Sequence, residues 1–325
     1  MEDRLRAGRL ASLFLVILVA LFLAAYGCSG GGGGGGGGIE YTGVTTQAVI
    51  DDTNSEDLTQ GAYIGGSAGS AMIGLGAVSQ SGVNDRPRYL NLAGILKNAI
   101  NQVDVNAPDG IVESGAIIQE SDSIIGDCGG SASYVISLND QTGDFTGSFT
   151  FSSYCSEGVI ISGSASFSGD YDDVNSEFVG FSIITSGLTV TSGGDSFTTS
   201  GNISFNFQAS PATVTADVML RDNTTGEVSW VDNYSLTVTE GPNYEDITFS
   251  GRFYHPIHGY VGVSTPTAFR IFDGDIWPSQ GVLLVDGAGG AKARLTADPS
   301  FSYRVEADTD GDGDFDDYDS GLVSW

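Results

Sequence analysis

Residues 159–169, VIISGSASFSG, decide the fold class of this chain. Val159, Ile161, Ala165 and Phe167 occupy every second position counted from Val159, and serine fills most of the positions between them. A period of two is typical of a β-strand with one face buried and the other in water. The segment therefore predicts a half-buried strand of an antiparallel sheet.

The same alternation recurs along most of the chain after residue 110. It is found in SASYVISL (131–138), FTGSFTFS (145–152), FVGFSIITSGLTVT (178–191), SFTTSGNISFNFQ (196–208), TVTADVML (213–220), VSWVDNYSLTVT (228–239) and DITFSGRFY (246–254). Short joints rich in Gly, Asn and Asp separate these strands, which favours an antiparallel meander, since parallel pairing needs long crossovers. The predicted fold is mainly β, with residues 109–325 forming a sandwich or a barrel-like body.

The preceding residues, 41–108, have a mixed pattern. Thr53 and Glu56 have the spacing of a capping box at the start of a short helix. Residues 65–78, GGSAGSAMIGLGAV, are rich in small residues and predict a loop or a weak strand. Apolar residues recur at helical spacing in residues 86–103, which predicts a helix over about 88–103 that caps one open end or face of the sheet.

The first 27 residues have the pattern of a targeting segment. Three arginines precede an apolar stretch at residues 10–25, and Gly27 then precedes Cys28. This resembles the bacterial lipobox, although Ala25 and Tyr26 depart from its commonest residues, and it predicts cleavage before a lipidated Cys28. The alternative is an uncleaved helical anchor, since about 17–25 apolar residues can span a bilayer.

A run of nine glycines follows, within the segment 28–40. Such a run cannot pack a core and predicts a flexible tether between the lipid anchor and the folded body. Ser29, rather than Asp, follows the cysteine, which by analogy with enterobacterial sorting favours the outer membrane. Whether the body faces the periplasm or the outside is left open.

The mature chain is strongly acidic. Three of the 12 Lys and Arg and two of the 41 Asp and Glu lie in the targeting segment, which leaves nine basic against 39 acidic residues. This charge argues against nucleic-acid partners and favours a soluble, monomeric envelope protein with an affinity for divalent cations.

Cys128 and Cys155 are the two cysteines that remain once Cys28 is lipidated. An even pair in an oxidising compartment predicts a disulfide, which would stabilise the fold by about 3 kcal/mol. Paired metal thiolates are the alternative, but neither cysteine has neighbours at metal-ligand spacing.

The segment DTDGDGDFDDYD, residues 308–319, carries seven Asp in twelve positions. With Asp308 as the first position of a calcium loop, Gly313 falls at the sixth, where such loops turn sharply. The predicted ligands are Asp308, Asp310, Asp312, Asp314, Asp316 and Asp319. An Asp at the twelfth position and a strand-like flank, FSYRVEA (301–307), differ from a helix-loop-helix hand, so we expect calcium in a loop between strands. A solvated acidic turn is the alternative.

The two histidines of the chain, His255 and His258, lie together in FYHPIHGYV (253–261). A pair at this spacing can ligate zinc, but Pro256 indicates a turn and no third ligand follows from the spacing. We interpret the segment as an aromatic-rich corner that joins two strands.

Taken together, several segments resemble a group of uncharacterised lipoproteins of Gram-negative envelopes. They are the lipobox with its glycine run, YTGVTTQAVIDDTNSEDL (41–58), CGGSASY (128–134), FSSYCSEGVIISGSASFSG (151–169), GRFYHPIHGYV (251–261), AKARLT (291–296) and DTDGDGDFD (308–316). The resemblance implies an envelope lipoprotein and no particular activity. A glycine tether before a β body is also similar in layout to surface lipoproteins of the transferrin-binding type, which supports the architecture alone.

Two functional hypotheses follow. The first is a non-enzymatic, lipid-anchored envelope protein, a structural or binding module with a calcium-stabilised loop near its C-terminal end and a protein or glycan partner left open. The alternative is a secreted-type polysaccharide hydrolase with structural calcium, suggested by its β-rich, acidic character and by aromatics such as Trp230, Tyr254 and Trp277. A carrier of a small molecule or haem is a third class, with no motif behind it.

Overall fold

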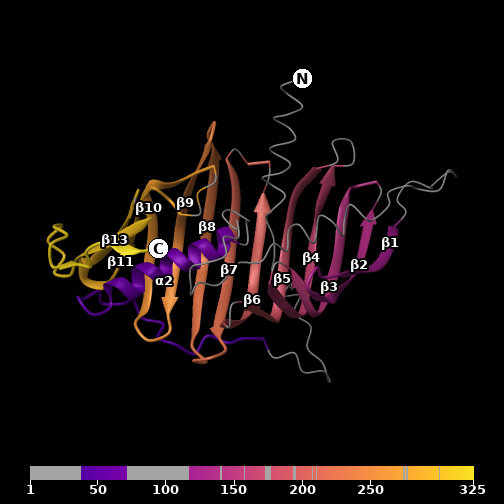
Figure 1. Cartoon of the computed structure of the whole chain (residues 1–325), viewed down its shortest axis with the longest axis horizontal. Coiled ribbons are helices and arrows are strands. Elements are labelled where there is room, and N and C mark those ends of the chain that lie inside the picture. Colours follow the sequence, from indigo (N-terminus) through magenta and orange to yellow (C-terminus); the bar gives the residue numbers. More distant parts are fainter. Residues whose placement is uncertain are drawn as a thin grey trace.

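A computed structural model of the chain describes residues 38–71 and 117–325, apart from residues 140, 157, 173–176, 193–194, 207, 210, 274, 276 and 300. The targeting segment, Cys28, most of the glycine run and the helix predicted at 88–103 lie outside the described residues. Figure 1 shows a broad twisted sheet with one helix lying across part of one face.

The described residues form one 15-stranded antiparallel sheet in which β1 to β14 follow one another in chain order and β15 pairs with β13. The strands are β1 (Ile117–Ile125), β2 (Gly129–Asn139), β3 (Asp144–Ser156), β4 (Val159–Asp172), β5 (Glu177–Ser192), β6 (Asp195–Asn206), β7 (Ala212–Asp222), β8 (Val228–Glu240), β9 (Tyr244–His255), β10 (Gly259–Phe272), β11 (Gln280–Asp286), β12 (Lys292–Asp298), β13 (Ser302–Asp308), β14 (Tyr318–Asp319) and β15 (Val323–Ser324).

The predicted mainly β fold and its antiparallel meander are confirmed, and each strand expected from alternation is present. Of the two architectures left open, a closed barrel is not formed, because β1 and β14 lie at opposite ends of the pairing order among the described strands. The short strand β15 pairs with Ser302 and Tyr303 of β13.

Helix α2 (Ser55–Ala71) packs on the sheet over β8 to β13. Its Leu58 and Ala62 are fully buried and join the core formed by inward-facing residues of the strands below, such as Leu295 and Val305. A 3₁₀ turn, η2 (Ala288–Gly290), links β11 to β12. The sheet is therefore covered on this half by a helix that precedes it in the chain.

The extent of α2 corrects one prediction. Residues 65–71, read as part of a loop or weak strand because of their glycines, continue the helix. The small residues permit close packing: a Cβ at Gly61 would lie 2.6 Å from ring carbons of Phe253, and one at Gly65 would lie 2.7 Å from Val231. Tertiary packing at these two glycines outweighs their low helix propensity.

The start of α2 also differs from the predicted capping box. The Thr53 hydroxyl donates to the Asp51 carboxylate, which also accepts the backbone N–H groups of Thr53 and Asn54. Asp51 therefore orders the turn before the helix, and these bonds lower its pKa. The Glu56 carboxylate accepts bonds from Gln60 and from Tyr318, so it takes part in a tertiary contact.

Candidate metal centre

The acidic segment forms the loop between β13 and β14, and Asp308 is its buried first residue. Asp308 is 1% exposed, and its two carboxylate oxygens accept the N–H groups of Gly311 at 2.7 Å and Gly313 at 3.0 Å. Both glycines have positive φ, 79° and 100°. The chain thus folds over the Asp308 carboxylate in a conformation that side-chain-bearing residues rarely adopt.

The alternating aspartates that follow shape the loop itself. The Asp310 carboxylate accepts the N–H of Asp312 at 3.1 Å, and the Asp312 carboxylate accepts the N–H of Asp314 at 2.9 Å. Each is a side-chain bond to the backbone two residues on, a geometry typical of turns. The spacing of Asp at every second residue is therefore explained in part by these turns, and does not by itself indicate an ion.

Asp317 folds back onto the start of the loop. One of its oxygens accepts the N–H of Thr309 at 2.7 Å, the hydroxyl of Thr309 at 2.8 Å and the N–H of Asp310 at 3.2 Å. These bonds, with that from the Thr309 backbone the strongest, lower the pKa of Asp317. Its carboxylate is therefore charged at neutral pH.

The folded loop brings together three carboxylates, those of Asp308, Asp310 and Asp317. One oxygen from each lies within 4.8 Å of the others, so the three together could hold a metal ion. Asp308 and Asp310 belong to the predicted set of ligands. Asp317 was missed, because it directly follows Asp316 and falls outside the spacing of the calcium-loop pattern.

The other four predicted ligands, Asp312, Asp314, Asp316 and Asp319, are not part of this group. Asp312 is engaged by the loop backbone, as described above. Asp319 accepts bonds from the Gly321 N–H at 2.8 Å and from the Arg304 guanidinium at 3.3 Å. The side chain of Asp319 therefore links β14 to Arg304 of β13 and to the backbone that follows β14.

The loop is attached to the sheet by aromatic contacts. The Arg294 guanidinium lies 4.4 Å from the centre of the Phe315 ring and also bonds Glu306 at 2.9 Å. Trp325 stacks on Trp277 and lies 4.7 Å, between ring centres, from both Tyr63 and Tyr303. Phe315, within the acidic segment, and Trp325, beyond it, thus both contact packed side chains.

Two further predictions concern pairs of residues outside the loop. Cys128 and Cys155 form a disulfide, with Cα atoms 5.1 Å apart, next to the pairing of β2 with β3. His255 ends β9 and His258 lies in the turn before β10, so the segment joins two strands as expected. The two imidazole rings stack with centres 4.5 Å apart.

Comparisons of the chain with protein-family models, with curated proteins and with solved structures give no match. Among the residues that the structure describes, no helix combines the length and apolar character needed to cross a membrane.

Proposed function

We propose that this protein is a non-enzymatic, lipid-anchored protein of the bacterial cell envelope, whose sheet serves as a structural or binding module and whose loop between β13 and β14 binds calcium. The observation that carries the proposal is the gathering of the Asp308, Asp310 and Asp317 carboxylates at the edge of the sheet. The lipobox-like segment ending at Cys28, the glycine tether and the resemblance to envelope lipoproteins support a location in the cell envelope.

Calcium suits this loop because all three side-chain donors are carboxylate oxygens. Calcium takes six to eight oxygen ligands, and backbone carbonyls and water commonly complete such a set. Three carboxylates whose oxygens lie within 4.8 Å of one another repel when all are ionised. A divalent cation removes this repulsion, and its binding stabilises the fold through Asp308 at the end of β13.

Affinity in the range of about 10⁻⁴–10⁻³ M is expected for an extracellular calcium module. At 10 mM calcium this affinity corresponds to about 1.5–3 kcal/mol of added stability. The remaining surface is acidic, so a protein or glycan partner is favoured over nucleic acid, and mutual repulsion favours a monomer.

The calcium part is tested by thermal unfolding of the full-length protein in detergent, first with EDTA and then with 10 mM calcium. Calcium is expected to raise the melting temperature of the wild type. Asp310→Asn and Asp317→Asn are expected to abolish the rise, and both keep a side-chain oxygen that can accept the loop's hydrogen bonds.

Asp316→Asn is the matched control, since it removes one charge from an exposed neighbour outside the three-carboxylate group. The geometry predicts a normal calcium response in this variant, whereas the spacing pattern predicts a loss. An equal response in Asp317→Asn and Asp316→Asn would contradict the site, and no response in the wild type would leave the loop as a solvated turn.

The anchor is tested separately with Cys28→Ser. The wild type is expected to fractionate with membranes and to carry fatty acyl groups, palmitate among them, on the N-terminal peptide seen by mass spectrometry. Cys28→Ser is expected to lose the acyl groups and to remain uncleaved. A wild-type chain that keeps residues 1–27 and has no acyl group would favour the helical anchor instead.

A further inference from the structure

The turn between β9 and β10 places both histidines on one side of a fixed loop. His255 is the last residue of β9, and it pairs across the turn with Gly259, the first residue of β10. The N-terminal segment holds this turn from outside: the Tyr41 hydroxyl donates to the carbonyl of His255 at 3.0 Å, and the Val44 N–H donates to the carbonyl of Pro256 at 3.2 Å.

Gly259 explains how closely the N-terminal segment approaches. Its φ is 97°, and a Cβ there would lie 2.2 Å from the carbonyl oxygen of Thr46. The Tyr260 N–H donates to that carbonyl at 3.0 Å, and the Ala48 N–H donates to the Tyr260 carbonyl at 2.8 Å. These bonds fix the path of the chain as it leads into α2, and so fix where the first turn of α2 meets the histidines.

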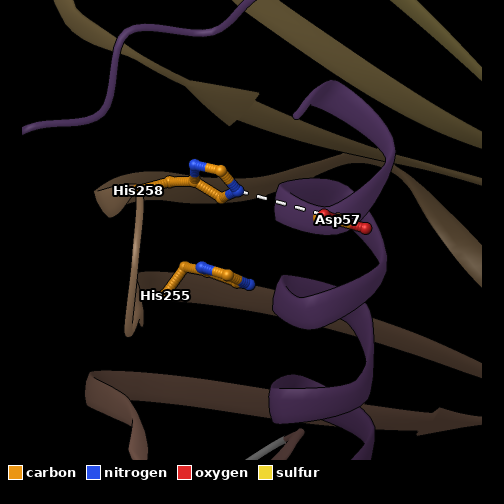
Figure 2. Close-up of side chains that lie close together, drawn as sticks. All are labelled: Asp57, His255 and His258. Atoms are coloured by element: carbon orange, nitrogen blue, oxygen red, sulfur yellow. Dashed lines mark ion pairs between the residues drawn. The ribbon is translucent and has the colours of Figure 1, made fainter. Parts of the chain in front are cut away.

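Asp57, in that first turn, supplies the third group. Its Oδ2 lies 3.9 Å from Nε2 of His258, and one ligand atom from each of Asp57, His255 and His258 lies within 4.8 Å of the other two. In Figure 2 both imidazole rings extend from the turn toward α2. The next residue, Leu58, is fully buried, which fixes the orientation of this helical turn.

We propose that Asp57, His255 and His258 form a binding site for a divalent transition metal of the zinc class. Two imidazole nitrogens and one carboxylate oxygen are ligands that zinc prefers, with water or a further group at the open position. Bonds of about 2.0–2.1 Å place tetrahedral ligand atoms about 3.3 Å apart. The side chain of Asp57 is 64% exposed. It can therefore rotate and bring its carboxylate oxygen closer to the imidazole nitrogens, as a bound metal requires.

A hydrogen bond within the histidine turn provides a direct reporter of metal binding. The Ile257 N–H donates to Nδ1 of His255 at 3.2 Å. A metal bound at Nε2 moves the ring proton to Nδ1, and the bond from Ile257 must then open. Binding is therefore expected to perturb the Ile257 amide.

This site differs in chemistry from the acidic loop, which offers oxygens alone. A metal bound here would cross-link the start of α2 to the β9–β10 turn, two segments about 200 positions apart in the chain. The site shares no residue with the acidic loop and does not involve the lipid anchor.

The test is zinc binding to the full-length protein in detergent, freed of metal and kept in 10 mM calcium so that the acidic loop does not compete. Titration against a chromophoric chelator is expected to show one zinc per chain, and cobalt is expected to give the absorption bands of a nitrogen- and oxygen-ligated site. His258→Gln and Asp57→Asn are each expected to weaken zinc binding at least tenfold.

Asp52→Asn is the matched control, because Asp52 is an exposed aspartate just before α2 and outside the group. This variant and Asp317→Asn are expected to bind zinc as the wild type does. Amide NMR reports directly on the site, with the Ile257 and Gly259 resonances expected to shift in the wild type. Zinc affinity unchanged in both His258→Gln and Asp57→Asn, or the absence of any wild-type binding, would overturn the proposal.

Discussion

The Tyr318 hydroxyl donates a hydrogen bond to the Glu56 carboxylate at 3.1 Å, although 262 positions separate the two residues. The bond joins β14, at the end of the acidic loop, to the first turn of α2. Glu56 directly precedes Asp57, so one turn of helix contacts both the loop strand and the histidine turn. Both candidate metal sites are therefore attached to the same end of α2.

Replacing Tyr318 with Phe tests this link. The variant keeps the ring and loses the hydroxyl, and we expect a loss of about 1 kcal/mol in the free energy of unfolding, as for a typical hydrogen bond at a partly exposed position. Urea denaturation of the metal-free protein measures it. Glu56→Gln keeps an acceptor oxygen and should lower the free energy of unfolding by less than Tyr318→Phe does. If Tyr318→Phe is as stable as the wild type, the hydrogen bond contributes nothing to stability.

Glu245 predicts a dependence of stability on pH. It lies opposite Glu240 in the pairing of β8 with β9. Burial, with smaller contributions from Glu240 and Asp273, raises the pKa of Glu245 to about 7. The folded state therefore binds more protons than the unfolded state between about pH 4.5 and 7. The contribution of Glu245 to stability is full below this window and is lost as the pH rises through it.

Glu245→Gln removes this titration. The difference in unfolding free energy between the variant and the wild type should grow in favour of the variant from pH 5 to pH 8, when both are measured by urea denaturation. Taking the difference cancels the titration of groups that the two proteins share. A difference that stays constant across this range would mean that Glu245 titrates with an ordinary pKa.

Gly61→Ala tests the close packing of α2. Alanine favours an isolated helix by about 1 kcal/mol over glycine, yet here we expect destabilisation by about 1–3 kcal/mol. The cause is the Phe253 ring, 2.6 Å from the position of the new Cβ. Ile64→Ala, at an exposed position of the same helix, is the control and should change stability little. A more stable Gly61→Ala protein would show that the helix can shift away from the sheet.

These residues also show how far the sequence could predict the fold. Most strands followed from alternation, because a sheet with one buried face forces a period of two. A strand was expected after the histidine turn, but the extent of β10 did not follow from alternation, since Pro266 interrupts the pattern where its pairing with β11 changes register. The length of α2 was missed because its glycines serve packing against Phe253 and Val231, contacts that local propensity cannot express.

The candidate sites were predictable only in part. Asp308 and Asp310 follow from spacing within the loop, whereas Asp317 enters through the hydrogen bonds that fold the loop back on Thr309. Asp57 stands 198 positions before His255, so no local motif could associate the two. The antiparallel pairing of β9 with β10 and the packing of α2 create that proximity.

The disulfide predicts where the sheet opens first. Cys128 lies in the turn between β1 and β2, and Cys155 lies on β3 opposite Gly129. Closing a loop of 27 residues stabilises by about 3 kcal/mol, so the double variant Cys128→Ala/Cys155→Ala should lose about this much in urea denaturation. Hydrogen exchange should accelerate in β1 to β3, which form one end of the sheet, more than in β9 to β13 beneath α2. A reductant should lower the free energy of unfolding of the wild type by a similar amount and leave that of the double variant unchanged. If hydrogen exchange in the double variant instead accelerates evenly over all strands, the sheet unfolds as one unit.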